Sequence, residues 1–165
     1  MEKTALRLRP ATEDDDDAIW AIMAPVIRAG ETYPLPRDLD RTGALAYWRV
    51  AGNTVFVAAD GGRVAGSYYL RANAGGGGAH VANCGYMVAP QARGRGVARA
   101  MCLHSLGEAK ARGFRAMQFN FVISTNAAAV HLWRSCGFEI VGRLPGAFLH
   151  PAEGYVDALV MYRTI

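Results

Sequence analysis

The sequence predicts an α+β fold, an α/β sandwich of about seven strands and about four helices. A turn signal at 60–62 (Asp-Gly-Gly) joins two apolar runs and predicts an antiparallel hairpin. An apolar run over 81–88 leads through a glycine turn into an amphipathic segment over 97–112. The next apolar run, 116–123, should lie parallel to the first because crossover connections are right-handed. The 165 residues contain no repeat or linker, so a single domain over 1–165 is expected.

Composition argues against several classes of protein. The net charge is +4 and the arginines are scattered, whereas a nucleic-acid surface needs a basic stripe with interleaved aromatic residues. No apolar stretch approaches the roughly 20 residues of a membrane span. No apolar region follows Met1 as in a signal peptide, so a cytoplasmic location is expected. No nucleic acid or membrane partner is therefore expected.

Neither the cysteines nor the acidic residues have the spacing of a metal site. The three cysteines, Cys84, Cys102 and Cys136, are an odd number and are expected to be buried free thiols in a reducing compartment. The aspartates at 14–17 complement the dipole at the start of a helix that Thr12 opens in a capping box. No metal is expected.

The first half of the chain predicts strands, helices and a proline-containing loop. Its strands and helices are expected at 6–10 (strand), 12–26 (helix), 41–50 (helix), and 54–59, 63–70 and 79–88 (strands). Two prolines make 31–40 a loop. The glycine-rich 73–78 is expected to be a mobile surface connection.

The second half predicts a strand–helix–strand unit followed by two more strands. Gly113 should end the helix after the glycine turn, and Gly137 should end the next one. After the strand at 116–123, the remaining elements are a helix at 127–136 and strands at 138–144 and 155–162. A long loop is expected over 145–154, because it begins with Pro145 and Gly146 and ends with Gly154.

The segment 88–100 has the features of an anion-binding turn. Pro90 cannot donate to a β-ladder and should end the strand before it. Gly94 and Gly96 allow a tight turn with unobstructed amides, and the next helix begins with unpaired N–H groups at its positive end. Three arginines add positive charge: Arg93, Arg95 and Arg99. Together they predict a site for a phosphate-bearing ligand.

The glycine pattern distinguishes between phosphate ligands. A dinucleotide fingerprint needs a third glycine where Arg99 stands and an acid on the following strand, and a P-loop needs Gly-Lys-Ser/Thr. Neither is present. The pattern Gln91-x-x-Gly94-x-Gly96 after a strand resembles the acetyl-CoA motif of the GCN5-related N-acetyltransferase (GNAT) superfamily, whose loop amides hold the CoA pyrophosphate.

A second segment, 126–138, resembles the other conserved motif of that superfamily: an Asn, a helix and a Gly-Phe step into a strand. The resemblance implies an N-acetyltransferase with a mixed, mostly antiparallel sheet whose parallel central pair splays. It implies acetyl-CoA as cosubstrate, with the pantetheine arm in that gap. The cofactor-binding residues implied are Met87, Val88, Arg93, Gly94, Arg95, Gly96, Val97, Ala98, Asn126 and Trp133.

The chain more closely resembles acetyltransferases of proline analogues such as azetidine-2-carboxylate. The segments concerned are 82–88, 93–96, 115–120 and 124–126. That resemblance implies that Asn83 and Asn120 bind and orient the acceptor, and that Asn126 serves CoA or the reacting centre. Asn120 and Asn126 are also the candidates to hold a catalytic water wire. Both Asn83 and Asn120 lie in apolar strands, where a buried amide needs partners. The alternative is that they hydrogen-bond each other or the splayed backbone and serve the structure alone.

Two catalytic groups common in the superfamily are missing. No Asp or Glu occurs between Arg63 and Gly107, and Trp133 stands where a Tyr acid is common. The substitutes are an acceptor that arrives neutral, a water wire held by asparagines, or a histidine. His150, in the 145–154 loop, is the histidine candidate, and Phe148 is a candidate for the pocket wall.

The leading hypothesis is acetyl transfer to a small amine, an amino acid or a cyclic imino acid. In the superfamily the region between the first two strands walls the acceptor site, so Glu31, Thr32 and Tyr33 are candidate contacts or parts of a solvated loop. The alternatives are a protein or peptide acceptor, or an acyl-CoA sensor without turnover. The resemblance also implies a homodimer.

Overall fold

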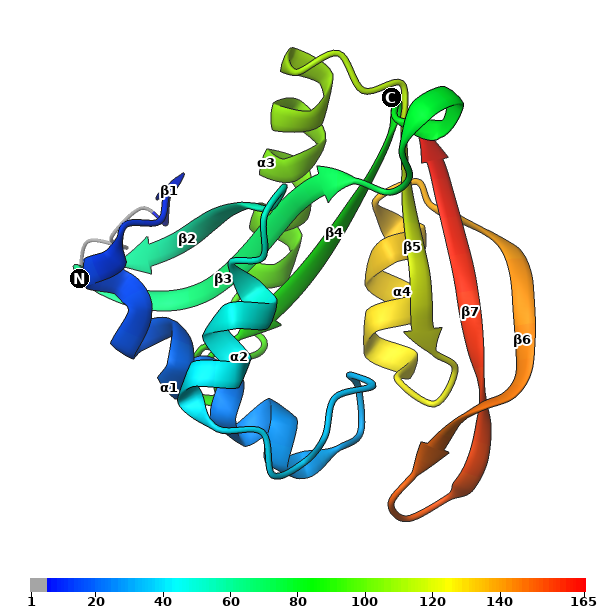
Figure 1. The fold of residues 1–165 in the computed structure, drawn as a ribbon, viewed down its shortest axis with the longest axis horizontal. Coiled ribbons are helices and arrows are strands. Elements are labelled where there is room, and N and C mark those ends of the chain that lie inside the picture. The colour runs from blue at the N-terminus through cyan, green and yellow to red at the C-terminus, as the bar shows by residue number, and fades with distance from the viewer. Residues whose placement is uncertain (1–5) are drawn as a thin grey trace.

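The computed structural model describes residues 6–165, which form one mixed seven-stranded sheet in the order β1-β2-β3-β4-β5-β7-β6 (Figure 1). Its strands are β1 (Arg7–Pro10), β2 (Thr54–Asp60), β3 (Arg63–Ala72), β4 (Val81–Val88), β5 (Ala116–Ile123), β6 (Glu139–His150) and β7 (Gly154–Thr164). Only β4 and β5 pair in parallel; every other neighbouring pair is antiparallel. The predicted fold class is confirmed.

The central parallel pair separates almost as soon as it forms. Residues pair only at Val81 with Ala116 and at Ala82 with Met117. Beyond these positions the strands diverge towards the carboxyl end of β4 (Figure 1). Backbone groups on the facing edges are consequently left without a ladder partner, and a ligand can approach them there.

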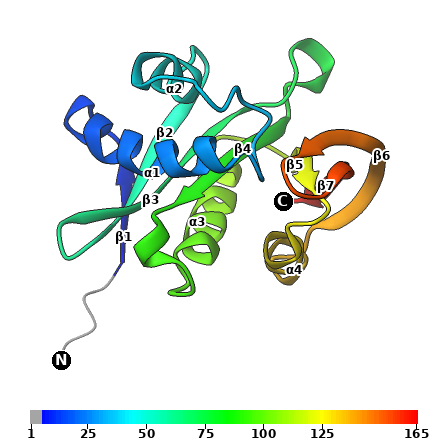
Figure 2. The ribbon, with the colours of Figure 1, turned by 90° about the horizontal axis from the view of Figure 1, so that it is seen from below.

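Helices cover both faces of the sheet, with α1 and α2 on one side and α3 and α4 on the other (Figure 2). Their bounds are α1 (Asp16–Ala29), α2 (Arg41–Trp48), α3 (Val97–Ala111) and α4 (Ala127–Ser135). Trp48 is fully buried and donates from Nε1 to Ser67 Oγ at 2.9 Å, which fixes α2 to β3. The buried face of α3 includes Met101, Cys102, Ser105 and Ala109.

The chain leading into α1 is held by ion pairs. A short 3-10 turn, Glu13–Asp15, precedes α1, so the α-helix begins later than Thr12 predicted. Asp15 accepts two hydrogen bonds from the Arg9 guanidinium, both at 2.7 Å, and one from the Thr12 amide at 2.8 Å. The Arg9 hydrogen bonds lower the pKa of Asp15 to about 2. The acidic run therefore serves the start of the helix.

The prediction of a loop over 145–154 is wrong. β6 continues to His150 and forms a hairpin with β7, so that only residues 151–153 turn. The register shifts between Leu144 and Phe148, and this bulge accommodates Pro145, which cannot donate to a ladder. Asp157 on β7 supports the bulge by accepting from the Gly146 amide at 2.9 Å.

Cys84, Cys102 and Cys136 are all buried and free, as predicted. Burial raises the pKa of Cys84 to about 12, so this thiol stays protonated at neutral pH. Among residues 6–165, no helix is long and apolar enough to cross a membrane.

Candidate functional site

The turn between β4 and α3 presents open backbone amides. A 3-10 turn, Pro90–Ala92, ends the strand, and Gly94 and Gly96 have φ of +72° and +79°. A Cβ atom added to either glycine would meet no atom within 4 Å, so nothing covers the turn. Gly96 is the N-cap of α3, and no side chain caps the helix there. Its first N–H groups therefore remain available to an anion.

The three arginines predicted around this turn differ in position. Arg93 and Arg99 line a cavity beside the turn, and Arg99 also donates to Ser135 Oγ on α4 at 3.0 Å. Arg95 does not line the cavity; it pairs with the Asp60 carboxylate at the end of β2. Arg95 therefore fastens the turn to the β2–β3 hairpin.

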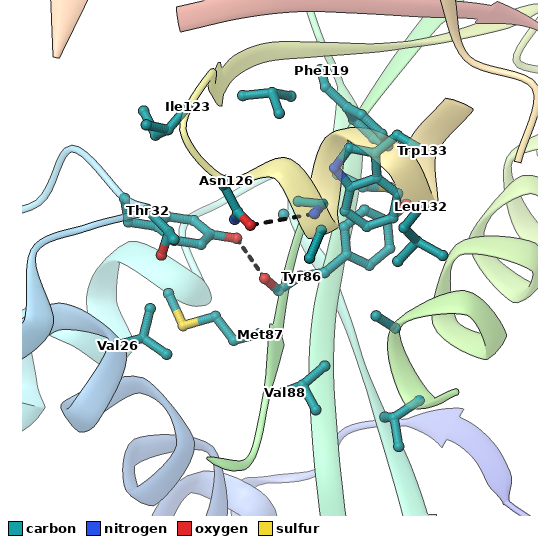
Figure 3. Close-up of a pocket in the computed structure, with 18 of the residues that line it drawn as sticks. Val26, Thr32, Tyr86, Met87, Val88, Phe119, Ile123, Asn126, Leu132 and Trp133 are labelled. Atoms are coloured by element: carbon teal, nitrogen blue, oxygen red, sulfur yellow. Dashed lines mark hydrogen bonds between the residues drawn. The ribbon is translucent and has the colours of Figure 1, made fainter. Parts of the chain in front are cut away.

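The cavity has a volume of about 680 Å³ and runs through the gap between β4 and β5 (Figure 3). On the α3–α4 side it is lined by residues of the glycine turn and α4: Arg93, Gly94, Gly96, Val97, Ala98, Asn126, Leu132 and Trp133. On the α1–α2 side it is lined by Val26, Thr32, Tyr33, Pro34, Tyr47 and Tyr69. Two ligands can thus enter from opposite faces of the sheet and meet beside Met87 and Val88.

The loop after α1 is tied to the edge of β4. The Tyr33 hydroxyl donates to the Tyr86 carbonyl at 2.9 Å, one of the dashed contacts in Figure 3. Burial raises the pKa of Tyr33. Thr32 and Tyr33 border the cavity, whereas Glu31 is exposed and does not. Tyr33 is thus part of the wall rather than of a solvated loop.

The three predicted asparagines all line the cavity, but in different ways. Asn83 is half-buried and donates from Nδ2 to the Gln118 carbonyl at 2.9 Å, bridging β4 to β5. Asn120 is exposed, not buried as its apolar strand suggested, and donates to Asn73 Oδ1 at 2.6 Å. At this position β5 pairs with neither neighbour, because β4 has diverged and the register with β7 shifts between Phe119 and Val122.

Asn126 is the N-cap of α4. Its Oδ1 accepts a hydrogen bond from the Ala129 amide at 3.3 Å, which leaves Nδ2 without a hydrogen-bond partner among the described residues (Figure 3). One amide group therefore both starts the helix and presents a donor to the cavity.

Phe148 and His150 lie in the β6–β7 hairpin and do not line the cavity. Phe148 is buried against Phe121, with ring centroids 6.2 Å apart. His150 Nδ1 accepts from the amides of Ala152 and Glu153 at 3.1 and 3.2 Å. His150 therefore stabilises the turn, and the sequence misplaced both residues because it predicted a loop here.

The cavity wall contains no conventional acid or base. Among the described residues that line it, none is Asp, Glu or His. Trp133, at the position of the common Tyr acid, is buried against Tyr86 and Phe119 with ring centroids 5.0 Å away in each case. The titratable groups at the β4–β5 gap are therefore phenols and the Cys84 thiol.

Sequence reasoning missed two tyrosines of the wall, Tyr47 and Tyr69. Their rings meet edge to face with centroids 6.4 Å apart. Burial and the neighbouring Tyr47 raise the pKa of Tyr69. The alternation of side chains along β3 predicts the face of the sheet on which Tyr69 lies. It does not predict that Tyr69 lies opposite a glycine that makes room for its ring.

Comparison with known proteins identifies the family. The model of the acetyltransferase (GNAT) family matches residues 19–138. N-acetyltransferase aca1 of Schizosaccharomyces pombe is 34% identical over 96 residues, which are 58% of this chain and 46% of that protein. The chain therefore spans about half the length of this curated relative.

Two solved structures extend the likeness to nearly the whole chain. A GCN5-related N-acetyltransferase from Kribbella flavida is 43% identical, with a TM-score of 0.92 and 98% of both chains covered. A phosphinothricin acetyltransferase from Sinorhizobium meliloti, in complex with acetyl-CoA, shares the fold at 22% identity, with a TM-score of 0.85 and coverage of 97% of this chain and 88% of that one. The chain belongs to the acetyltransferase (GNAT) family.

Proposed function

We propose that the protein transfers the acetyl group of acetyl-CoA to the amine of a small molecule, an amino acid or a cyclic imino acid of the proline-analogue type. The observation that carries this proposal is the cavity that passes through the splayed sheet. One mouth lies at the uncapped start of α3, and the other is walled by aromatic and amide side chains. A ternary complex in such a cavity brings amine and thioester together.

The α3–α4 mouth suits the phosphates and the pantetheine arm of acetyl-CoA. The amides at 94–98 and the start of α3 would hold the pyrophosphate, with Arg93 and Arg99 beside them. The unpaired edge of β4 at Met87 and Val88 would hydrogen-bond the arm as an added strand. Asn126 and Trp133 would border the thioester. The solved Sinorhizobium relative, which binds acetyl-CoA, supports this cosubstrate.

The cavity wall favours an acceptor that reacts as the neutral amine. An ammonium ion loses solvation in a mostly apolar cavity and finds no carboxylate among its described lining residues. Asn83 Oδ1 accepts no hydrogen bond from residues 6–165 and would accept one from the amine. Backbone N–H groups near Val88 would polarise the thioester carbonyl. Proximity then supplies much of the acceleration.

The direct test combines calorimetry with a thiol-release assay. Purified protein should bind CoA and acetyl-CoA, and it should release thiol with small amines bearing an amino-acid head. Turnover on peptide N-termini alone would establish the peptide alternative. Tight CoA binding without turnover on any amine would establish the sensor. The family resemblance also supports a cytoplasmic homodimer. Light scattering would test whether the protein is a dimer in solution.

Replacing Asn126 by serine is expected to lower kcat at least tenfold while the protein keeps its melting temperature. Serine retains an oxygen that caps α4 but lacks the Nδ2 donor that faces the cavity. Asp40 provides the matched control, because it caps α2 through a 2.8 Å bond from Gly43 and does not line the cavity. Asp40→Ala should cost about 1 kcal/mol of stability and leave kcat unchanged. Near-normal turnover of Asn126→Ser would limit Asn126 to capping.

The pH dependence of kcat/KM should follow the acceptor alone. The rate should rise about tenfold per pH unit until the pKa of the acceptor amine, because only its neutral form attacks. Cys84, Tyr33 and Tyr69 have raised pKa values and remain protonated over this range, so none acts as a base. A second acceptor with a less basic amine should shift the break by the difference between the two amine pKa values. A break that stays fixed would reveal a titrating base in the protein.

A further inference from the structure

A polar row lies across β3 and β4 at the acceptor mouth of the cavity. Tyr69 and Arg71 alternate along β3 and lie directly opposite Gly85 and Asn83 of β4. Directly opposed residues of an antiparallel pair share a face, with Cβ atoms about 4.5–5.5 Å apart. Arg71 therefore lies on the same face as Asn83 and as Tyr69, which is two residues earlier on β3. Asn83 and Tyr69 line the cavity, and Arg71 is not among its lining residues.

The ring of Tyr69 lies across Gly85. A Cβ atom on Gly85 would come within 2.5 Å of Tyr69 Cε1 and within 2.9 Å of its hydroxyl oxygen. The hydroxyl is close enough to Arg71 for the guanidinium charge to lower the pKa of Tyr69 against the larger effect of burial. Tyr69 and Arg71 thus place a hydroxyl and a cation on the same face of β3.

The charge of Arg71 is not neutralised within the described chain. Six other arginines form ion pairs with carboxylates within 4.0 Å, but Arg71 forms none in residues 6–165. Its guanidinium is exposed and donates only a 3.3 Å bond to the Ala72 carbonyl. Four N–H donors remain for an anionic ligand.

We propose that Arg71, assisted by the Tyr69 hydroxyl, binds the carboxylate of the acceptor while Asn83 Oδ1 accepts from its amine. This inference rests on the proposed acetyl transfer to a small amine. An α-amino or α-imino acid carries its amine and carboxylate on one carbon, which suits recognition by the adjacent Asn83 and Arg71. Polyamines and other polycations are excluded as acceptors, because they would meet an uncompensated guanidinium.

The test compares Arg71→Gln with Arg63→Gln on two acceptors, proline and prolinamide. Arg63 is the matched control because it is exposed on the same strand but lies at the far end, next to the hairpin turn. Arg71→Gln should lower kcat/KM for proline about 10- to 100-fold, the effect of losing a charge-assisted hydrogen bond. It should change kcat/KM for prolinamide less than about threefold and leave the KM for acetyl-CoA unchanged. Arg71→Lys should recover part of the loss.

The outcomes separate this inference from the proposed function. An equal loss on both acceptors, or no loss on either, would overturn the carboxylate subsite while leaving acetyl transfer intact. So would a wild-type preference for prolinamide or spermidine over proline after kcat/KM is corrected for the fraction of each acceptor that is neutral amine. Failure of the wild-type protein to bind acetyl-CoA or to acetylate any amine would overturn the proposed function, and the subsite with it.

Discussion

An aspartate in place of Gly96 is expected to weaken acetyl-CoA binding at least about 100-fold. The residue caps α3 at the uncovered turn, so its carboxylate would lie among the amides proposed to hold the pyrophosphate. Two like charges about 4 Å apart near a protein surface repel by about 4 kcal/mol, which corresponds to roughly 1,000-fold in affinity. Calorimetric titration with acetyl-CoA measures the loss.

Backbone strain from the substitution needs its own control, because Gly96 has φ of +79°. Gly52 has φ of +93° and equally open surroundings, and it lies in the turn between α2 and β2, away from the cavity. Gly52→Asp should lose similar stability, about 1–2 kcal/mol, and bind acetyl-CoA normally. If both variants bound acetyl-CoA with equal affinity, the proposal that the phosphates bind at this turn would be wrong.

Substituting alanine for Gly85 is expected to reduce kcat/KM for the acceptor at least about tenfold and to leave acetyl-CoA affinity within about threefold of wild type. The new methyl would overlap the Tyr69 ring, which must then shift in the acceptor mouth or push β3 from β4. Overpacking of this kind costs about 1–3 kcal/mol of stability. Steady-state kinetics with both substrates and thermal unfolding measure these effects.

A strand glycine without such a neighbour isolates the effect of the clash. In Gly142→Ala the methyl would meet Val160 on β7 at an ordinary 3.5 Å, so kinetics should be unchanged. The double variant Gly85→Ala/Tyr69→Ala should show strong non-additivity, because removing the ring removes the clash. Additive losses would show that the methyl acts through β4 itself rather than through Tyr69.

The sequence determined the elements whose signals are local. The β2–β3 turn needs only the backbone freedom of its glycines, and the turn before α3 needs Pro90, Gly94 and Gly96 within seven residues. The predicted parallel crossover from β4 through α3 to β5 is also present. These features sufficed to recognise the family and to expect the phosphate turn.

Local signals failed where distant residues decide the conformation. Pro145 and Gly146 predicted a loop, yet Asp157, eleven residues away on β7, accepts from the Gly146 amide and holds a bulge inside β6. Phe148 and His150 were misplaced for the same reason. Asn120 was expected to be buried, but it is exposed where β4 has diverged and the pairing of β5 with β7 shifts register.

Only the tertiary structure assembled the acceptor wall. Tyr69 lines the cavity, and Arg71 lies on the same face of β3 without lining it, because the register of β3 on β4 places them opposite Gly85 and Asn83. Tyr33 reaches the cavity by bonding to the Tyr86 carbonyl. Register and splay depend on hydrogen bonds and packing between segments far apart in the chain, and periodicity within a segment does not specify them. The sequence by itself therefore determined the fold and indicated the turn proposed to bind the cosubstrate, whereas tertiary pairing decided which side chains line the proposed acceptor mouth.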